Sequence, residues 1–193
     1  DSGQGWILRS GEDSWNTVYR RGQLLGRNKL VAASPGSGPA VFQAYVSSGM
    51  WIDQIYAELG FDGTVGWGGF TTGSANDGGS LTGRANKATD IYLNFTNSAF
   101  AGGGYFQCKG NGNEIRRIKV DGALSGALSG PSINGGDYCT IEDVVVKGSP
   151  NASVQNSSRS TVRRYDGSVT DTGTNTNKEN NGVGKAALGK FFM

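Results

Sequence analysis

The stretch EIRRIKVDG at residues 114–122 decides the fold. It reads polar, apolar, two charged residues and then apolar again at Ile118 and Val120, before a closing polar residue and glycine. The pattern returns in TIEDVVVKG at residues 140–148 and, shortened, in TVRRYDG at residues 161–167. Its apolar positions are mostly β-branched, which favours strands over helices. A pattern that repeats in the same direction predicts strands stacked in parallel, one per repeat.

The first apolar residue of each copy marks one rung of this stack. Two earlier copies are WIDQIYA at residues 51–57 and a weaker, strictly alternating DIYLNF at residues 90–95. One coil cannot bury its apolar face alone, so neighbouring coils must stack. The sequence therefore predicts an all-β fold, a right-handed parallel β-helix of about five coils, with rungs anchored near Ile52, Ile91, Ile115, Ile141 and Val162.

A second strand is predicted in each coil, ahead of the repeat. Ile133 lies eight residues before Ile141, and Val154 lies eight residues before Val162. The residues between them are rich in Gly, Asn, Asp and Ser, which are turn formers. Each coil is thus expected to read strand, tight turn, strand, two-residue kink, strand and loop.

Stacking the anchors also aligns the charged residues at the kink. One column would contain Arg116, Glu142 and Arg163, and the next Arg117, Asp143 and Arg164. Both columns alternate basic, acidic, basic, and such cross-strand pairs contribute roughly 0.2–1 kcal/mol each. This alternation supports the register, and it interprets Glu142 and Asp143 as solvated ladder partners rather than as a catalytic pair.

Composition excludes several classes of function. The 193 residues include 33 Gly, two Cys and no His, with a net charge of +2. Without His, Ser-His-Asp catalysis and most zinc sites are excluded, so no metal site and no cofactor are predicted. The basic residues are scattered, which predicts no nucleic-acid partner. No stretch approaches the ~18 apolar residues of a membrane span, so no membrane insertion is predicted.

Three segments are expected along the chain. Residues 1–40 do not fit the repeat and are predicted to form a cap or linking segment. Residues 41–169 would form the β-helix, with a long Gly-rich loop at residues 60–88 of the kind that is often functional. Residues 170–193 would be a flexible polar linker and an apolar tail that docks on a neighbour or on the open end of the helix.

The repeats at residues 115–122 and 141–148 resemble those of the pectate-lyase-like superfamily of right-handed β-helices. Within it, the Gly-, Asn-, Ser- and Thr-rich coils are most similar to bacteriophage tailspike or tail-fibre proteins. The resemblance implies a homotrimer in the virion, in the phage tail, that recognises and in some members depolymerises a bacterial surface polysaccharide. The chain departs from the pectate lyases, because no cluster of aspartates for calcium and no ladder of stacked Asn is evident in the sequence.

Candidate site residues gather around the first rung and the loop after it. Glycoside hydrolysis uses two carboxylates about 5–5.5 Å apart for retention or about 6.5–9.5 Å apart for inversion. Glu58 or Asp62 is therefore the candidate general acid, with Asp53 as its partner. Three aromatic residues beside them are candidates for stacking on sugar rings: Trp51, Tyr56 and Trp67.

Two alternatives to a depolymerase remain. The chain can be a non-enzymatic, structural or glycan-binding β-helical spike module, which the weak carboxylate pairing and the absence of His fit equally well. It can also be a bacterial surface adhesin or a secreted carbohydrate enzyme, which would place it outside the cell or on the cell surface.

Overall fold

The computed structural model describes the strands and the turns beside them. The described residues are 8–10, 15–31, 42–44, 48–62, 64–71, 84–95, 101–108, 111–122, 133–135, 137–146, 153–156, 159–166, 168–171, 177–179 and 181. Their regular structure is entirely β-strand. No helix in this part of the chain is long and apolar enough to cross a membrane.

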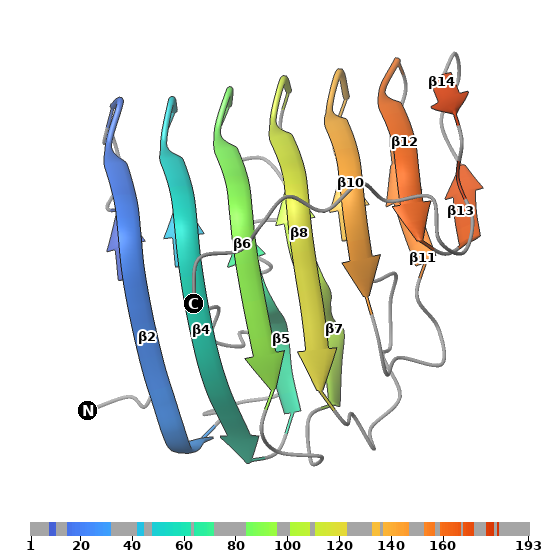
Figure 1. The fold of residues 1–193 in the computed structure, drawn as a ribbon. Coiled ribbons are helices and arrows are strands. Elements are labelled where there is room, and N and C mark those ends of the chain that lie inside the picture. The colour runs from blue at the N-terminus through green and yellow to red at the C-terminus, as the bar shows by residue number, and fades with distance from the viewer. Residues whose placement is uncertain are drawn as a thin grey trace.

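The strands form two sheets of seven strands each, and every pairing is parallel (Figure 1). The front sheet contains, in spatial order, β2 (Val18–Val31), β4 (Trp51–Asp62), β6 (Lys87–Phe95), β8 (Glu114–Gly122), β10 (Thr140–Val146), β12 (Thr161–Asp166) and β14 (Asn177–Glu179). The back sheet contains β1 (Leu8–Ser10), β3 (Phe42–Ala44), β5 (Thr64–Thr71), β7 (Ala101–Cys108), β9 (Ile133–Gly135), β11 (Ser153–Asn156) and β13 (Ser168–Asp171).

Consecutive strands alternate between the two sheets, and each sheet adds strands in chain order. This architecture is compatible with a parallel β-helix. The ladder has seven rungs rather than the predicted five or so. It begins earlier, because β2 lies within residues 1–40, and ends later, with β14 beyond residue 170. Part of the expected loop at residues 60–88 is strand β5, while residues 72–83 lie outside the described part.

Three columns of apolar side chains from the front sheet line the core. The first anchor column is buried and runs through Ile52, Ala88, Ile115, Ile141 and Val162. The second, three residues on, runs through Ile55, Ile91, Ile118, Val144 and Tyr165. A third follows through Ala57, Leu93 and Val120. The predicted anchor Ile91 is therefore wrong by three residues, since Ala88 occupies the first anchor position of that rung.

The spacing of three between buried anchors arises from a bend in every long front strand. The residue at the bend has a left-handed backbone, with φ between 50° and 58°, in a column that we call the kink column: Arg21, Gln54, Asp90, Arg117, Asp143 and Arg164. A left-handed residue reverses the inside-outside alternation once, so two apolar side chains separated by two polar ones both face inward. The predicted two-residue kink is confirmed, and it is also present in β6, where the sequence suggested none.

A second bend precedes each front strand from β2 to β12, and buried Asn side chains link the bends before β4, β6 and β8. The Asn86 side-chain oxygen accepts from the Met50 N–H at 2.8 Å, and that of Asn113 accepts from the Asn86 N–H at 2.9 Å. Both Asn side chains are buried. A short Asn stack therefore exists, contrary to the sequence expectation, and Ser160 continues it by accepting from the Cys139 N–H.

Candidate functional site

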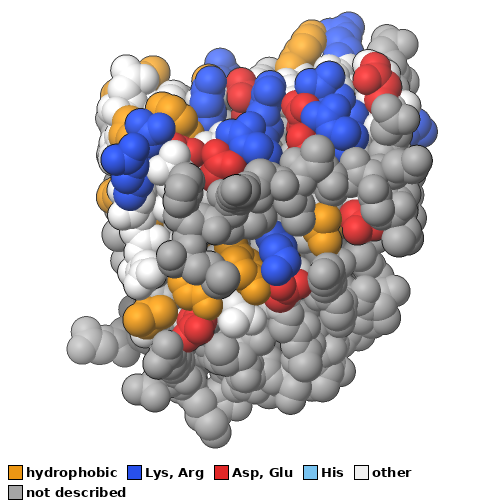
Figure 2. Space-filling model, in the orientation of Figure 1, with side chains coloured by type: hydrophobic (Ala, Val, Ile, Leu, Met, Phe, Trp, Pro, Cys, Tyr) orange, Lys and Arg blue, Asp and Glu red, His pale blue; other side chains and the backbone are white. Residues whose placement is uncertain are grey.

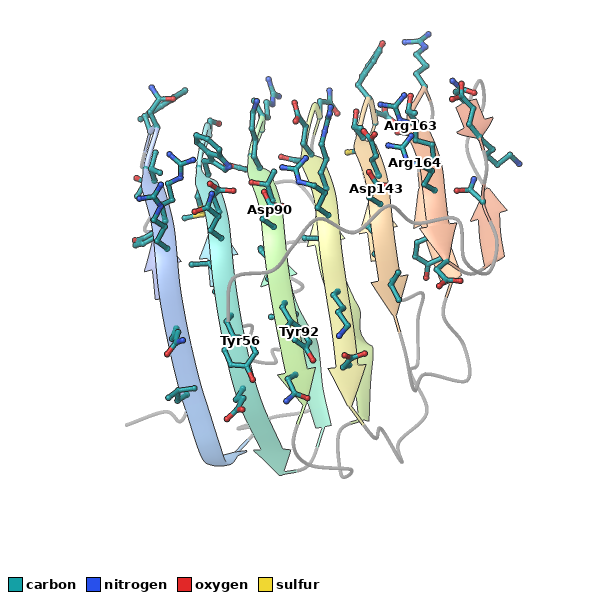
Figure 3. All side chains as sticks on the ribbon, in the orientation of Figure 1. Tyr56, Asp90, Tyr92, Asp143, Arg163 and Arg164 are labelled. Carbon is teal, nitrogen blue, oxygen red and sulfur yellow. The ribbon has the colours of Figure 1, made fainter. Side chains whose placement is uncertain are left out.

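The outward face of the front sheet carries two groups of polar side chains. Charged residues gather around the kink column and toward the bend that precedes the front strands, where blue and red side chains dominate in Figure 2. Farther along the strands lies a second group, which we call the tyrosine band: Tyr56 and Glu58 on β4, Tyr92 and Asn94 on β6, and Lys119 and Asp121 on β8. Figure 3 shows Tyr56 and Tyr92 on neighbouring strands, away from Asp90, Asp143, Arg163 and Arg164.

The residue just before the kink forms a column, which we call the charge column, whose charges alternate in sign except that uncharged Thr89 lies between Asp53 and Arg116. It runs through Arg20, Asp53, Thr89, Arg116, Glu142, Arg163 and Glu179. The predicted alternation and register are confirmed. Glu142 and Asp143 are both buried rather than solvated. Three guanidinium groups surround Glu142, from Arg116 at 3.4 Å, Arg163 at 2.8 Å and Arg164.

The pKa of Glu142 reflects two opposing effects. Burial raises the pKa of this carboxyl, but the hydrogen bonds and charges of Arg163 and Arg164 outweigh burial and leave the pKa below its usual range. Glu142 is thus held as a carboxylate and cannot serve as a proton donor near neutral pH. This arrangement supports a structural role for the charge column.

The kink column is stabilised by ion pairs across rungs. Arg117 donates to both carboxylate oxygens of Asp90, at 2.6 and 2.8 Å. Arg164 does the same with Asp143, at 2.6 and 2.9 Å. A two-pronged guanidinium–carboxylate pair fixes geometry as well as charge. These contacts hold the left-handed residues of neighbouring rungs in the same orientation.

The structure places two predicted site residues, Asp53 and Trp51, inside this structural network. Asp53 is buried; Thr89 Oγ1 donates to it at 2.5 Å and Arg20 Nε at 2.8 Å. The Trp51 indole N–H donates to Thr89 Oγ1 at 2.8 Å, and the Arg20 guanidinium lies over the Trp51 ring, 5.2 Å from its centroid. Both side chains are already engaged within the protein.

Tyr56 and Glu58, also predicted site residues, lie in the tyrosine band. The Tyr56 hydroxyl donates to Glu58 at 2.8 Å, and its ring meets that of Tyr92 edge-on, with centroids 5.3 Å apart. The Tyr92 hydroxyl donates to Asp121 at 2.8 Å. The Lys119 ammonium lies 4.2 Å from the centre of the Tyr92 ring and 2.5 Å from an Asp121 oxygen.

Electrostatics keep the tyrosine band protonated at its phenols and at its lysine. The hydrogen bond to Glu58, together with burial, raises the pKa of Tyr56. Burial and the hydrogen bond to Asp121 raise the pKa of Tyr92. The hydrogen bond to Asp121 raises the pKa of Lys119 against the opposing effect of burial. The band therefore offers aromatic rings beside two carboxylates and one ammonium group.

Asp53 and Glu58 lie on the same strand but on opposite sides of the Gln54 kink. Asp62 ends β4, and Trp67 lies in β5 of the back sheet, opposite Gly104; their side chains are outside what the structure describes. Asp53, Glu58 and Asp62 stay predictions as catalytic residues, as do Trp51, Tyr56 and Trp67 as sugar-binding residues.

Sequence reasoning missed four members of the band: Tyr92, Asn94, Lys119 and Asp121. The signal was present, because Tyr56, Tyr92 and Lys119 each follow the second anchor of their strand directly. Glu58, Asn94 and Asp121 follow two residues later. Taking Ile91 as a first anchor shifted β6 by three residues and concealed this alignment.

No group of three or more His, Cys, Asp or Glu suited to a metal ion occurs within the described ranges. The tyrosine band can stack on the apolar face of a sugar ring and exchange hydrogen bonds with hydroxyl groups.

No family model, curated protein or solved structure matches this chain.

Proposed function

We propose that this chain is a right-handed parallel β-helix of the pectate-lyase-like type, and that it serves in a phage tailspike-like protein by binding a bacterial surface polysaccharide. Strand alternation between two parallel sheets supports the helix. Right-handedness follows the general rule, since about 98% of parallel crossover connections have that hand. The homotrimer and the location in the phage tail remain part of this proposal and rest on the resemblance of the repeats.

The observation that carries the proposal is the tyrosine band. Tyr56 and Tyr92 are half-buried neighbours on adjacent rungs, and each holds a carboxylate through its hydroxyl. Parallel strands lie about 4.7–4.9 Å apart, comparable with the length of one pyranose unit in an extended glycan. A polysaccharide lying across β4, β6 and β8 would therefore meet one strand, with two outward polar or aromatic side chains, per sugar unit.

The Tyr56–Tyr92 pair offers two rings on adjacent rungs, whereas Trp51 offers one. A sugar on Trp51 would have to displace Arg20 from the ring and Thr89 from the N–H, and a sugar on Tyr92 would have to displace Lys119. A ring with a polar tip, such as tyrosine, combines an apolar face with a hydroxyl that can be shared with a ligand. Binding is thus assigned to the tyrosine band.

A panel of bacterial capsular and O-antigen polysaccharides tests the proposal. Isothermal titration of each with the protein is expected to show saturable binding to at least one of them. The same experiment with the Tyr56→Ala, Tyr92→Ala double variant is expected to show no heat of binding. Equal binding by the double variant would show that the tyrosine band is not the binding surface. Absence of binding to every polysaccharide of the panel would overturn the proposed function.

Depolymerisation is a second candidate, favoured by the positions of Glu58 and Asp121. They share one register column, separated by Asn94 on the intervening strand. Two strand spacings amount to about 9–10 Å, close to the upper limit of about 9.5 Å for carboxylates in inverting glycosidases. In this reading one carboxyl donates a proton to the leaving oxygen and the other activates water.

Measuring the release of reducing ends distinguishes a depolymerase from a protein that only binds the glycan. If the protein cleaves the glycan, Glu58→Gln and Asp121→Asn should each lower turnover at least about 100-fold, the usual contribution of a positioned acid or base. Asp53→Asn serves as the comparison, because Asp53 is engaged by Arg20 and Thr89. Cleavage that survives both band variants, or no cleavage by the native protein, would leave binding alone.

A further inference from the structure

Both sheets of the ladder end in strands that have one neighbour each among the described strands. At one end these are β1 and β2, and at the other β13 and β14. Because every pairing is parallel, the edge at one end has the polarity needed to pair with the edge at the other. A second copy displaced along the ladder, without inversion, would therefore continue both sheets.

The start of β2 has exposed apolar side chains and an outward-facing N–H. The Trp51 N–H donates to the Thr17 carbonyl, so that carbonyl faces β4. The N–H of Val18 belongs to the same trans peptide unit as that carbonyl and points the opposite way, so it faces away from β4. The side chains of Val18 and Trp15 are 53% and 70% exposed, unusual for residues of this type at a sheet edge.

The charge column shows a regularity that the two ends leave incomplete. Asp53 accepts from a donor on each neighbouring rung, Arg20 at 2.8 Å and Thr89 at 2.5 Å. Glu142 likewise lies between Arg116 and Arg163. Glu179, the last member, is opposite Arg163 on one side, and its other side is the end of the sheet.

Arg20 begins the same column at the opposite end and is 47% exposed. Placed beyond β14, it would become the second cationic neighbour of Glu179 and continue the alternation. The back sheet offers a matching register. An apolar residue occupies one column in every strand: Leu8, Phe42, Phe70, Phe106, Ile133, Val154 and Val169.

We propose that copies of this chain associate end to end, with the β1 and β2 end of one copy against the β13 and β14 end of the next. Arg20 of one copy then faces Glu179 of its neighbour, and Leu8 takes the register position beyond Val169. This assembly is independent of glycan binding. Because the two surfaces differ, this end-to-end contact is head-to-tail and open, and it lengthens rods along the ladder in addition to the side-by-side trimer of the proposed function.

Association is expected to depend on concentration, because β14 offers only three residues for pairing. Sedimentation velocity of the native protein should show a weight-average sedimentation coefficient that rises continuously with concentration. Added salt should weaken association by screening the Arg20–Glu179 contact. A monomer at every concentration, or a single closed species such as a trimer that grows no further, would overturn the inference.

Val18→Pro tests the β2 edge directly. Proline removes the outward N–H without removing a hydrogen bond to β4, and it is the residue that natural edge strands use against pairing. The midpoint concentration of assembly should rise about tenfold or more. Tyr138→Ser is the matched control, since Tyr138 is 50% exposed but lies at a bend away from both ends. Circular dichroism and the melting temperature verify that each variant folds.

A mixing experiment distinguishes head-to-tail stacking from pairing of two identical edges. Val18→Pro retains its β13 and β14 end, so an excess of this variant should terminate native rods and shorten them. Glu179→Lys, altered at the opposite end, should weaken association when alone, because it would face Arg20. Rods unaffected by both variants, or native assembly that stops at a dimer, would contradict the proposal.

Discussion

At the scale of the residue, the left-handed backbone of the kink column shapes each front strand. Non-glycine residues seldom adopt positive φ, and a left-handed conformation costs them roughly 1–2 kcal/mol. Here the cost recurs on six rungs, from Arg21 to Arg164. Ion pairs such as Asp90–Arg117 and Asp143–Arg164 offset part of it and explain why charged residues occupy these positions.

Two glycines at the other bend provide a matched pair for testing backbone strain. Gly49 and Gly112 have φ of 72° and 74°. A Cβ on Gly49 would collide with Asn16 Oδ1, whereas a Cβ on Gly112 would meet nothing within 4 Å. Because the exposed Asn16 side chain can rotate away from a Cβ on Gly49, Gly112→Ala and Gly49→Ala should each lower the free energy of unfolding by about 1–2 kcal/mol. Urea denaturation measures both, and an unchanged stability of Gly112→Ala would contradict backbone strain at this bend.

Glu142 should make stability depend on pH. Its folded pKa is lowered below the unfolded value of about 4.3. A lowered carboxyl pKa stabilises the fold above the unfolded pKa, and this contribution is lost as pH falls through the folded pKa. Urea unfolding between pH 7 and pH 3 is expected to show a flatter pH profile for Glu142→Gln than for the native protein.

At pH 7 the same variant should be less stable by about 1–3 kcal/mol, because the guanidinium groups lose a buried acceptor. The partial exposure of Arg116 and Arg163, 33% and 38%, keeps the effect at the low end through solvent screening. Glu179→Gln is the control at an exposed site. A pH profile for Glu142→Gln that parallels the native one would show that this carboxylate is not the responsible group.

At the scale of the element, each rung is recognisable in the sequence only where its anchors are large and β-branched. Ile115, Ile141 and Val162 were found for this reason. In β6 the first anchor is Ala88, which is too small to stand out beside Ile91. In β2 and β14 the anchor positions contain Tyr19 and Lys178, so the pattern carries no apolar signal there.

The same misalignment limited the candidate site. Tyr56 and Glu58 could be found because they follow a recognisable repeat, whereas Tyr92 was assigned to a strand without a kink. Lys119 and Asp121 look like ordinary alternating polar residues until the rungs are stacked. Which side chains meet across strands depends on register, and register requires every anchor to be placed correctly.

The buried pair Asn86 and Asn113 should contribute measurably to the free energy of unfolding, because each side chain accepts from a backbone N–H. Asn86→Ala removes the acceptor for the Met50 N–H and is expected to cost about 1–3 kcal/mol, the penalty of an unsatisfied buried donor. Asn111→Ala, an exposed Asn next to the same row of bends, should cost less than about 0.5 kcal/mol. Chemical denaturation compares them, and equal stability of the two variants would argue against a role for the stack.

At the scale of the whole molecule, the ladder tapers. Front strands shorten from 14 residues in β2 and 12 in β4 to 6 in β12 and 3 in β14. Beyond the kink, the described outward face has aromatic rings on β4 and β6 and carboxylates on β4 and β8; Figure 3 shows the two rings, Tyr56 and Tyr92. Among the described residues, structural ion pairs occupy the part of the ladder around the kink column, and the tyrosine band is the surface to which we ascribe recognition.

The most direct test compares single tyrosine variants in glycan binding. For the bacterial polysaccharide that binds best, isothermal titration should show that Tyr56→Ala and Tyr92→Ala each raise Kd about tenfold or more. Tyr138→Ala, which removes an exposed tyrosine outside the band, should leave Kd unchanged. Wild-type affinity in both band variants, or an equal loss in Tyr138→Ala, would contradict glycan recognition by this surface.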